Sequence, residues 1–185
     1  MIRTRTTVSV LAALIVTLTA CERVERLEPS PADLYTVNLQ PYSFNDLAPV
    51  DVAYRIVAQH RGWTPATIDL WQAFIVGDVI RKESGGCWNL RRGAVLANGG
   101  AGCQLARQGR HTDSGFGQVV PRSSPWLCEA EGLCGSDAIV ADAWSSMTAT
   151  LALIERSGRF PWCWSAYARR FHPGCNTAPR VWVNE

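Results

Sequence analysis

Lysine is almost absent from this sequence, and so is any surplus of positive charge outside the first twenty residues. Only Lys82 is a lysine, and removing Arg3 and Arg5 from the 18 basic residues leaves 16 against 16 acidic ones. Nucleic-acid binding needs a surplus of positive charge that displaces counterions from the phosphates. The balanced charge therefore argues against a nucleic acid as partner. Internal repeats and low-complexity tracts are absent as well.

The sequence also lacks an apolar run near its start that would span a bilayer. The run Val8–Val16 follows two arginines and is shorter than the roughly 20 residues of a transmembrane helix. Such a start is typical of an export signal, which we assign to residues 1–20. Residues 18–21, Leu-Thr-Ala-Cys, resemble a bacterial lipobox. This resemblance implies an exported lipoprotein that lipid on Cys21 anchors in the membrane; the alternative is an ordinary secretory signal and a secreted protein.

No two cysteines have the C-x-x-C spacing of a zinc site, and the 3 histidines do not form a ligand-like cluster. We therefore predict no metal ion and no cofactor. Besides Cys21 there are six cysteines, and an even number in an exported chain favours disulfides. Several pairings are possible, and the simplest one joins sequence neighbours: Cys87–Cys103, Cys128–Cys134 and Cys163–Cys175.

Residues 21–50 are rich in proline and turn formers, and we interpret them as a tether or irregular arm. Residues 51–185 are numerous enough for one domain with its own core, which we expect to be a monomer. Within this domain Asp51–Gln59 is a weakly helical stretch. Residues 85–135 are dense in glycine, proline and cysteine, and they predict loops with a short hairpin.

Two longer helices are predicted. The first begins at Thr64-Pro65, a capping residue followed by proline, and it has apolar residues at helical spacing up to Gly85-Gly86. The second follows Ser136-Asp137 and continues to Gly158. The first helix has Glu83 in its last turn, where the helix dipole and apolar neighbours favour the protonated form of a carboxyl group.

Two further segments contain groups that suit a binding cleft. In residues 115–121, Gly-Phe-Gly-Gln-Val-Val-Pro, the glycines Gly115 and Gly117 would let a backbone approach a ligand closely, with the amide of Gln118 beside it. Residues 162–167 contain aromatic rings with polar tips, which sugar-binding clefts use, and they end on Tyr167.

The order of these segments, Glu-Ser, then Gly-x-x-Gln-x-x-Pro, then Ala-Tyr, resembles the lytic transglycosylase and goose-type lysozyme families. The resemblance implies a mainly α (α+β), lysozyme-like fold of two lobes with an irregular disulfide-bonded loop region. It also implies peptidoglycan glycan strands as substrate. By the same resemblance Glu83 is the general acid/base, and Ser84, Gln118 and Tyr167 orient Glu83 or hold the sugar chain.

Other residues have competing interpretations. We expect surface or structural roles for His60, His111 and His172, because no serine or cysteine nucleophile motif accompanies them. Asp113 is the best candidate for a second carboxylate, although it also suits a turn before Ser-Gly. Among the tryptophans we expect two on helices to be buried, Trp71 and Trp144, and four in loops to suit sugar stacking: Trp88, Trp126, Trp162 and Trp164.

The expected reaction is cleavage of the β-1,4 bond between MurNAc and GlcNAc. Without a second carboxylate, the 6-hydroxyl of the muramic acid attacks, as in lytic transglycosylases. With Asp113 activating water, the protein would be a muramidase, a hydrolase. The remaining alternatives are a domain like the resuscitation-promoting factors, which acts on the same substrate, and a wall-binding lipoprotein of lysozyme-like shape without catalysis.

Overall fold

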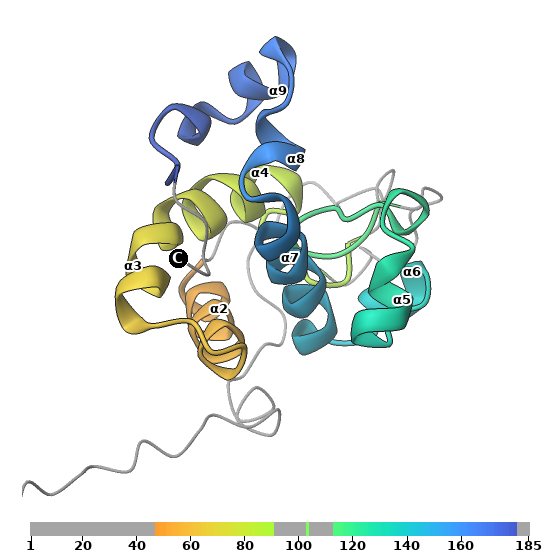
Figure 1. The fold of residues 1–185 in the computed structure, drawn as a ribbon. Helices are drawn as coiled ribbons and strands as arrows, with labels where there is room; N and C mark the ends of the chain where they lie inside the picture. The colour runs from red at the N-terminus through yellow and green to blue at the C-terminus, as the bar shows by residue number, and fades with distance from the viewer. Residues whose placement is uncertain (1–46, 91–102, 104–112, 181–185) are drawn as a thin grey trace, which may run out of the picture.

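The computed structural model describes residues 47–90, 103 and 113–180, and these residues are mainly helical (Figure 1). The elements are, in chain order, α2 (Ala48–His60), α3 (Pro65–Phe74), the π-helical segment η1 (Ile75–Ile80), α4 (Arg81–Glu83), the 3-10 turn η3 (Pro121–Ser123), α5 (Trp126–Glu131), α6 (Ser136–Ile139), α7 (Ala143–Ser157), α8 (Phe160–Cys163), α9 (Ala166–Phe171) and the 3-10 turn η4 (Pro173–Asn176). The predicted helical class is confirmed. The predicted signal, Cys21 and most of the arm lie outside the described residues, as does His111.

The first predicted helix is present as three consecutive segments, α3, η1 and α4. Thr64 is its N-cap, and the Thr64 hydroxyl accepts a hydrogen bond from the Thr67 backbone N–H. The helix ends at Glu83, as predicted, and Gly85 and Gly86 follow it with positive φ angles. The π-helical segment in the middle was not predicted. The weaker stretch Asp51–Gln59 is also helical, since it forms most of α2.

The second predicted helix is wrong at its start. Residues 136–139 form only the short helix α6, and α7 begins afresh at Ala143. The physical reason is Asp142, whose carboxylate accepts a hydrogen bond of 2.7 Å from the Ser145 backbone N–H. This side-chain cap gives a backbone N–H in the first turn of α7 a hydrogen-bond acceptor. Helix α7 therefore begins here and is separate from α6. The predicted end before Gly158 is confirmed.

Helix α7 is central, with α2 and α3 on one side of it and α5 and α6 on the other (Figure 1). A large apolar cluster lies between α2, α3, η1 and one face of α7, and it includes Tyr54, Trp71 and Leu151. A smaller cluster joins α5 and α6 to α7, and it includes Leu127 and Ile139. Burial of apolar surface on both sides of α7 is the main stabilising contribution to this arrangement.

The loop-rich part between residues 85 and 135 contains less β structure than predicted. In the described ranges its β structure is a single antiparallel bridge between Ser114 and Val119. The rest includes η3 and the short helix α5 as well as loops, and α5 was not predicted. Helix α5 ends at Gly132, which has the left-handed conformation that favours glycine.

Three disulfides join Cys87 to Cys103, Cys128 to Cys134, and Cys163 to Cys175. These are the three pairs that we predicted by joining cysteines that are neighbours in the sequence. Structural disulfides persist in oxidising compartments, so they indicate that the protein is exported. Within the described ranges, the helices are too short or too polar to cross a membrane.

An ion-pair cluster connects the end of α2 to α5 and α7. The Arg61 guanidinium, directly after α2, donates hydrogen bonds to Glu131 on α5 and to Glu155 on α7. The Trp63 indole N–H also donates to Glu155, at 2.7 Å. Burial by itself lowers the pKa of the Arg61 guanidinium, but its hydrogen bonds to Glu155 and Glu131 outweigh burial and raise that pKa above its ordinary value.

Replacing Arg61 with alanine is expected to lower the free energy of unfolding by about 3 kcal/mol, because two largely buried carboxylates lose their shared cation. Arg55→Ala is the matched control. Arg55 pairs with Asp51 and Asp69 at a more exposed site, where an ion pair contributes less than about 1 kcal/mol. Urea unfolding of both variants measures the difference, and equal losses would contradict the prediction.

Candidate active site

An open cavity of about 480 Å³ brings together residues from distant parts of the chain. Glu83 comes from the end of α4, Asp113 and Gln118 from the loop before η3, and Tyr167 from α9. All four are residues that the sequence predicts for the site. The volume is within the usual range for small-ligand sites.

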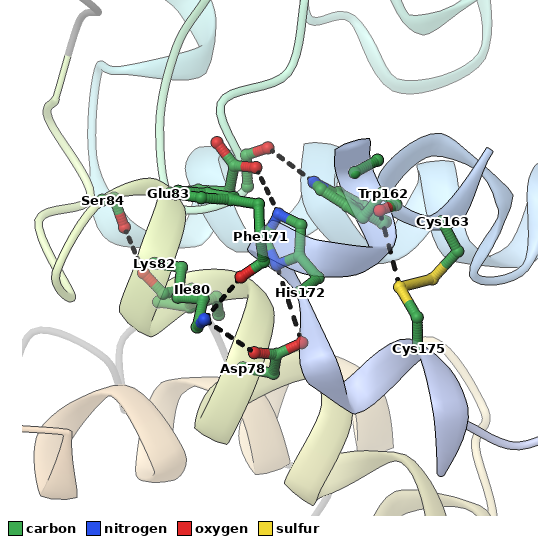
Figure 2. A network of polar contacts seen from close by, with 12 residues as sticks. Asp78, Ile80, Lys82, Glu83, Ser84, Trp162, Cys163, Phe171, His172 and Cys175 are labelled. Atoms are coloured by element: carbon green, nitrogen blue, oxygen red, sulfur yellow. Dashed lines mark hydrogen bonds and ion pairs between the residues drawn. A yellow bond between two sulfur atoms is a disulfide. The ribbon is translucent and has the colours of Figure 1, made fainter. Parts of the chain in front are cut away.

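Glu83 lines this site and has a close polar partner. A hydrogen bond of 2.7 Å joins its Oε1 to Nε2 of His172, which follows α9 (Figure 2). The Glu83 side chain is 23% exposed, so it is accessible from the cavity. The sequence predicts apolar neighbours for this carboxyl group, whereas the structure places an imidazole against it.

His172 belongs to the site although the sequence does not predict it there. The residue is 2% exposed, so the surface role is wrong, and the cavity wall includes it. Its Nδ1 lies 3.6 Å from Oδ2 of Asp78, on the side of the ring away from Glu83 (Figure 2). No local pattern in the sequence signals this contact, because 89 residues separate Glu83 from His172.

Asp78 is buried and is itself held in place. Its Oδ2 accepts a hydrogen bond of 3.0 Å from the backbone N–H of Gly174, and Lys82 Nζ lies 3.9 Å from its Oδ1. A side chain at position 174 would collide with Asp78, since a Cβ there would lie 2.6 Å from Oδ2. Glycine therefore allows η4 to approach the π-helical segment closely.

Gln118 holds its own loop in shape. It has a positive φ of 49°, which is uncommon for a residue with a side chain. Its side-chain Nε2 donates hydrogen bonds to the carbonyl oxygens of Leu90 and Gly115, at 3.1 and 2.9 Å. The amide therefore fixes the turn that carries it next to the cavity.

Gly115 and Gly117 serve packing rather than close approach of a ligand. A Cβ on Gly115 would lie 2.5 Å from the Ser146 hydroxyl, and one on Gly117 would lie 2.9 Å from Thr150. Both neighbours belong to α7, which also accepts hydrogen bonds from this loop: Phe116 N–H donates to Ser146 and Gly117 N–H donates to Thr150. We predicted that these glycines let a ligand approach the backbone. In the structure, the position that a Cβ would occupy faces α7 instead.

Ser84 also departs from its prediction. Its side chain is buried, and the hydroxyl donates to the backbone carbonyl of Ile80, at 3.1 Å (Figure 2). The same carbonyl also accepts a hydrogen bond of 3.0 Å from the Ser84 backbone N–H. Ser84 thus stabilises the turn after Glu83 and is not among the cavity-lining residues.

Aromatic side chains form the rim of the cavity on the α8 and α9 side. Trp164 is 67% exposed and Tyr167 is 80% exposed, and Phe171 is partly exposed beside them. Trp162 lines the same cavity but is buried, with its indole N–H donating to the Gly117 carbonyl. The exposed rings present flat apolar surface of the kind on which a sugar ring stacks.

Trp71, Trp88, Trp126 and Trp144 are not among the residues that line this cavity. Trp126 is covered by the Arg156 guanidinium, 4.6 Å above its ring, and Trp88 packs against the large apolar cluster. Trp71 is buried, as predicted, whereas Trp144 is only partly buried and contacts the ring of His60.

Asp113 lines the cavity together with Glu83, so both carboxylates considered for the chemistry reach one site. Among the residues that the structure describes, no group of three or more His, Cys, Asp or Glu side chains is arranged to hold a metal ion. The cavity lining contains carboxylates, the Lys82 ammonium, an imidazole, an amide and aromatic rings.

Comparison with models of protein families, with curated proteins and with solved structures finds no match for this chain. A function is therefore derived from the chemistry of the site itself.

Proposed function

We propose that the protein is a peptidoglycan-cleaving glycosidase with Glu83 as general acid/base, and that it is a lytic transglycosylase. The observation that carries the proposal is the shared cavity of Glu83, Gln118 and Tyr167. These residues come from three motifs that resemble those of lytic transglycosylases, and a single ligand in the cavity could contact all of them. The apolar clusters on both sides of α7 support a two-lobed, lysozyme-like shape.

The chemistry requires one proton at the departing oxygen. As the bond from the sugar C1 to this oxygen breaks, the Glu83 carboxyl group transfers its proton to the oxygen, and positive charge develops on the ring. In the transglycosylase route the muramic acid 6-hydroxyl oxygen then bonds to C1 and gives its proton to the Glu83 carboxylate. Glu83 is thereby restored, and no water is consumed.

Asp113 supports a second candidate, a muramidase. Because Asp113 lines the same cavity as Glu83, it could activate a water molecule that attacks C1. In the third candidate, a wall-binding lipoprotein, the aromatic rim binds the glycan and nothing is cleaved. In all three candidates the exported protein acts in the cell envelope, anchored there if Cys21 is lipidated.

The products of peptidoglycan digestion distinguish the two reactions. We expect anhydro-muropeptides, each one water molecule lighter than the hydrolysis product, when purified peptidoglycan is digested and the products are weighed by mass spectrometry. Asp113→Asn is expected to leave this activity within about threefold of wild type, because a transglycosylase needs no second carboxylate. Products with only reducing ends, lost in Asp113→Asn, would instead identify a muramidase.

A further inference from the structure

We infer that His172 is a positioning residue for Glu83, held as an imidazolium by Asp78, so that Oε2 of Glu83 is the oxygen that exchanges the proton with substrate. This inference rests on the proposed function. It concerns a contact outside the three motifs, and it follows from the order Asp78, His172, Glu83 along one line of polar contacts (Figure 2).

The Nδ1 atom of His172 faces Asp78. This atom is buried, lies 3.6 Å from Asp78 Oδ2, and has no hydrogen-bond partner among the described residues. Gly174 N–H and Lys82 both stabilise negative charge on Asp78. A lone pair on Nδ1 facing an ionised carboxylate would be repelled, whereas an N–H at this position is attracted. Nδ1 is therefore protonated.

The Nε2 atom of His172 is 2.7 Å from Glu83 Oε1. If Nε2 has no proton, the hydrogen bond needs the acid proton of Glu83 on Oε1, where the imidazole occupies it. If Nε2 carries a proton, it donates to Oε1 whether Glu83 is protonated on Oε2 or ionised. Only the second arrangement leaves the acid proton free to face the cavity. His172 is then protonated on both nitrogens, and the charge of Asp78 neutralises it.

The charged groups around this ring come from each element packed against it. Asp78, on η1, lies beside Nδ1 of the ring, and Glu83, on α4, lies beside Nε2. Lys82 contacts Asp78 and the Phe171 carbonyl rather than the ring. Asp113 lines the same cavity as Glu83. Two carboxylates therefore contact the imidazole, one at each ring nitrogen, and the one nearby ammonium contacts Asp78 and not the ring.

The π-helical segment explains how both carboxylates reach one imidazole. Residues five apart in an α-helix are offset by about 140° around the axis, so Asp78 and Glu83 would face different directions. The π-helical hydrogen bonds of η1 underwind the chain between Ile75 and Ile80, which reduces this offset. Segments of this kind are frequent at functional sites.

The proton positions can be measured directly by NMR of the protein with ¹⁵N-labelled histidine. At a pH where the protein cleaves peptidoglycan, we expect both ring nitrogens of His172 to be protonated. Asp78→Asn is expected to remove the proton from Nδ1, and Glu83→Gln to shift the Nε2 signal. His60, which contacts Trp144 far from the cavity, is the internal reference in the same spectra.

Activity measurements test whether this arrangement matters for catalysis. His172→Leu is expected to lower kcat about 100-fold with KM within about threefold, since a single lost donor at the acid affects the reaction rather than binding. His172→Gln retains an N–H donor that does not titrate. We expect it to recover about tenfold of this loss, because the amide N–H can still donate to Glu83 Oε1. Thermal unfolding confirms that each variant is folded, and His60→Gln is the matched control with unchanged kcat.

The two possible failures give different results. A wild-type protein that cleaves no peptidoglycan would overturn the proposed function, whatever the NMR spectra show. A neutral His172 at the pH of activity, or a folded His172→Leu variant with the kcat of wild type, would overturn the inference about His172 and leave Glu83 as the acid.

Discussion

Glu83→Gln is expected to lower the kcat of peptidoglycan cleavage by about 10³-fold, the middle of the range for losing a general acid/base. Glutamine has the same shape but has no proton of suitable acidity to give to the departing oxygen. Its amide can still bond to His172, so the cavity and glycan binding should remain. A zymogram shows the loss, and the release of soluble muropeptides measures it.

The matched control is Glu129→Gln, at an exposed position on α5. This variant loses one carboxylate from the same chain and should cleave at the wild-type rate. Thermal unfolding shows whether either variant is destabilised. Activity in Glu83→Gln within tenfold of wild type would exclude Glu83 as the acid. Binding of insoluble peptidoglycan by wild type without any cleavage would favour the wall-binding lipoprotein.

Removing the Cys163–Cys175 disulfide is expected to lower the free energy of unfolding and to impair the site as well. The bond closes a segment with α9 in it, and α9 has six residues, none of them buried. A helix of six residues is unstable by itself. The position of α9 therefore depends on the contacts and covalent bonds at its two ends. A disulfide closing a segment of this length stabilises a protein by about 3 kcal/mol.

The double variant Cys163→Ala/Cys175→Ala should lose that free energy of unfolding in urea. It should also cleave peptidoglycan at least about tenfold more slowly at a temperature where it is fully folded, because Tyr167 and His172 lie within the freed segment. The control is Cys128→Ala/Cys134→Ala. This pair is six residues apart, not twelve, and neither cysteine lines the cavity, so we expect a loss of about 2 kcal/mol and wild-type cleavage. Equal loss of activity in both double variants would show that α9 needs no covalent support.

Several features could be predicted because they depend on neighbours in the sequence. Thr64 caps a helix that begins at the next residue, and glycines after Glu83 end that helix. The break between α6 and α7 was missed although its signal is equally local. Asp142 is a good cap, but the apolar spacing across it suggested an uninterrupted helix. The roles of Gly115 and Gly117 were misjudged because only the packing against α7 shows which side needs the space.

By itself the sequence determined the helical class and the helix that ends at Glu83, and it offered the pairing of neighbouring cysteines as the simplest of several. These depend on hydrogen bonds, caps and short closures within a few residues. Only the tertiary structure placed His172 between Glu83 and Asp78 and gathered Gln118 and Tyr167 around one cavity. Such contacts join segments up to 96 residues apart, and they form where apolar burial and the Cys163–Cys175 disulfide bring η4 against the π-helical segment. No local pattern encodes that approach, because the chain must first fold before those side chains can meet.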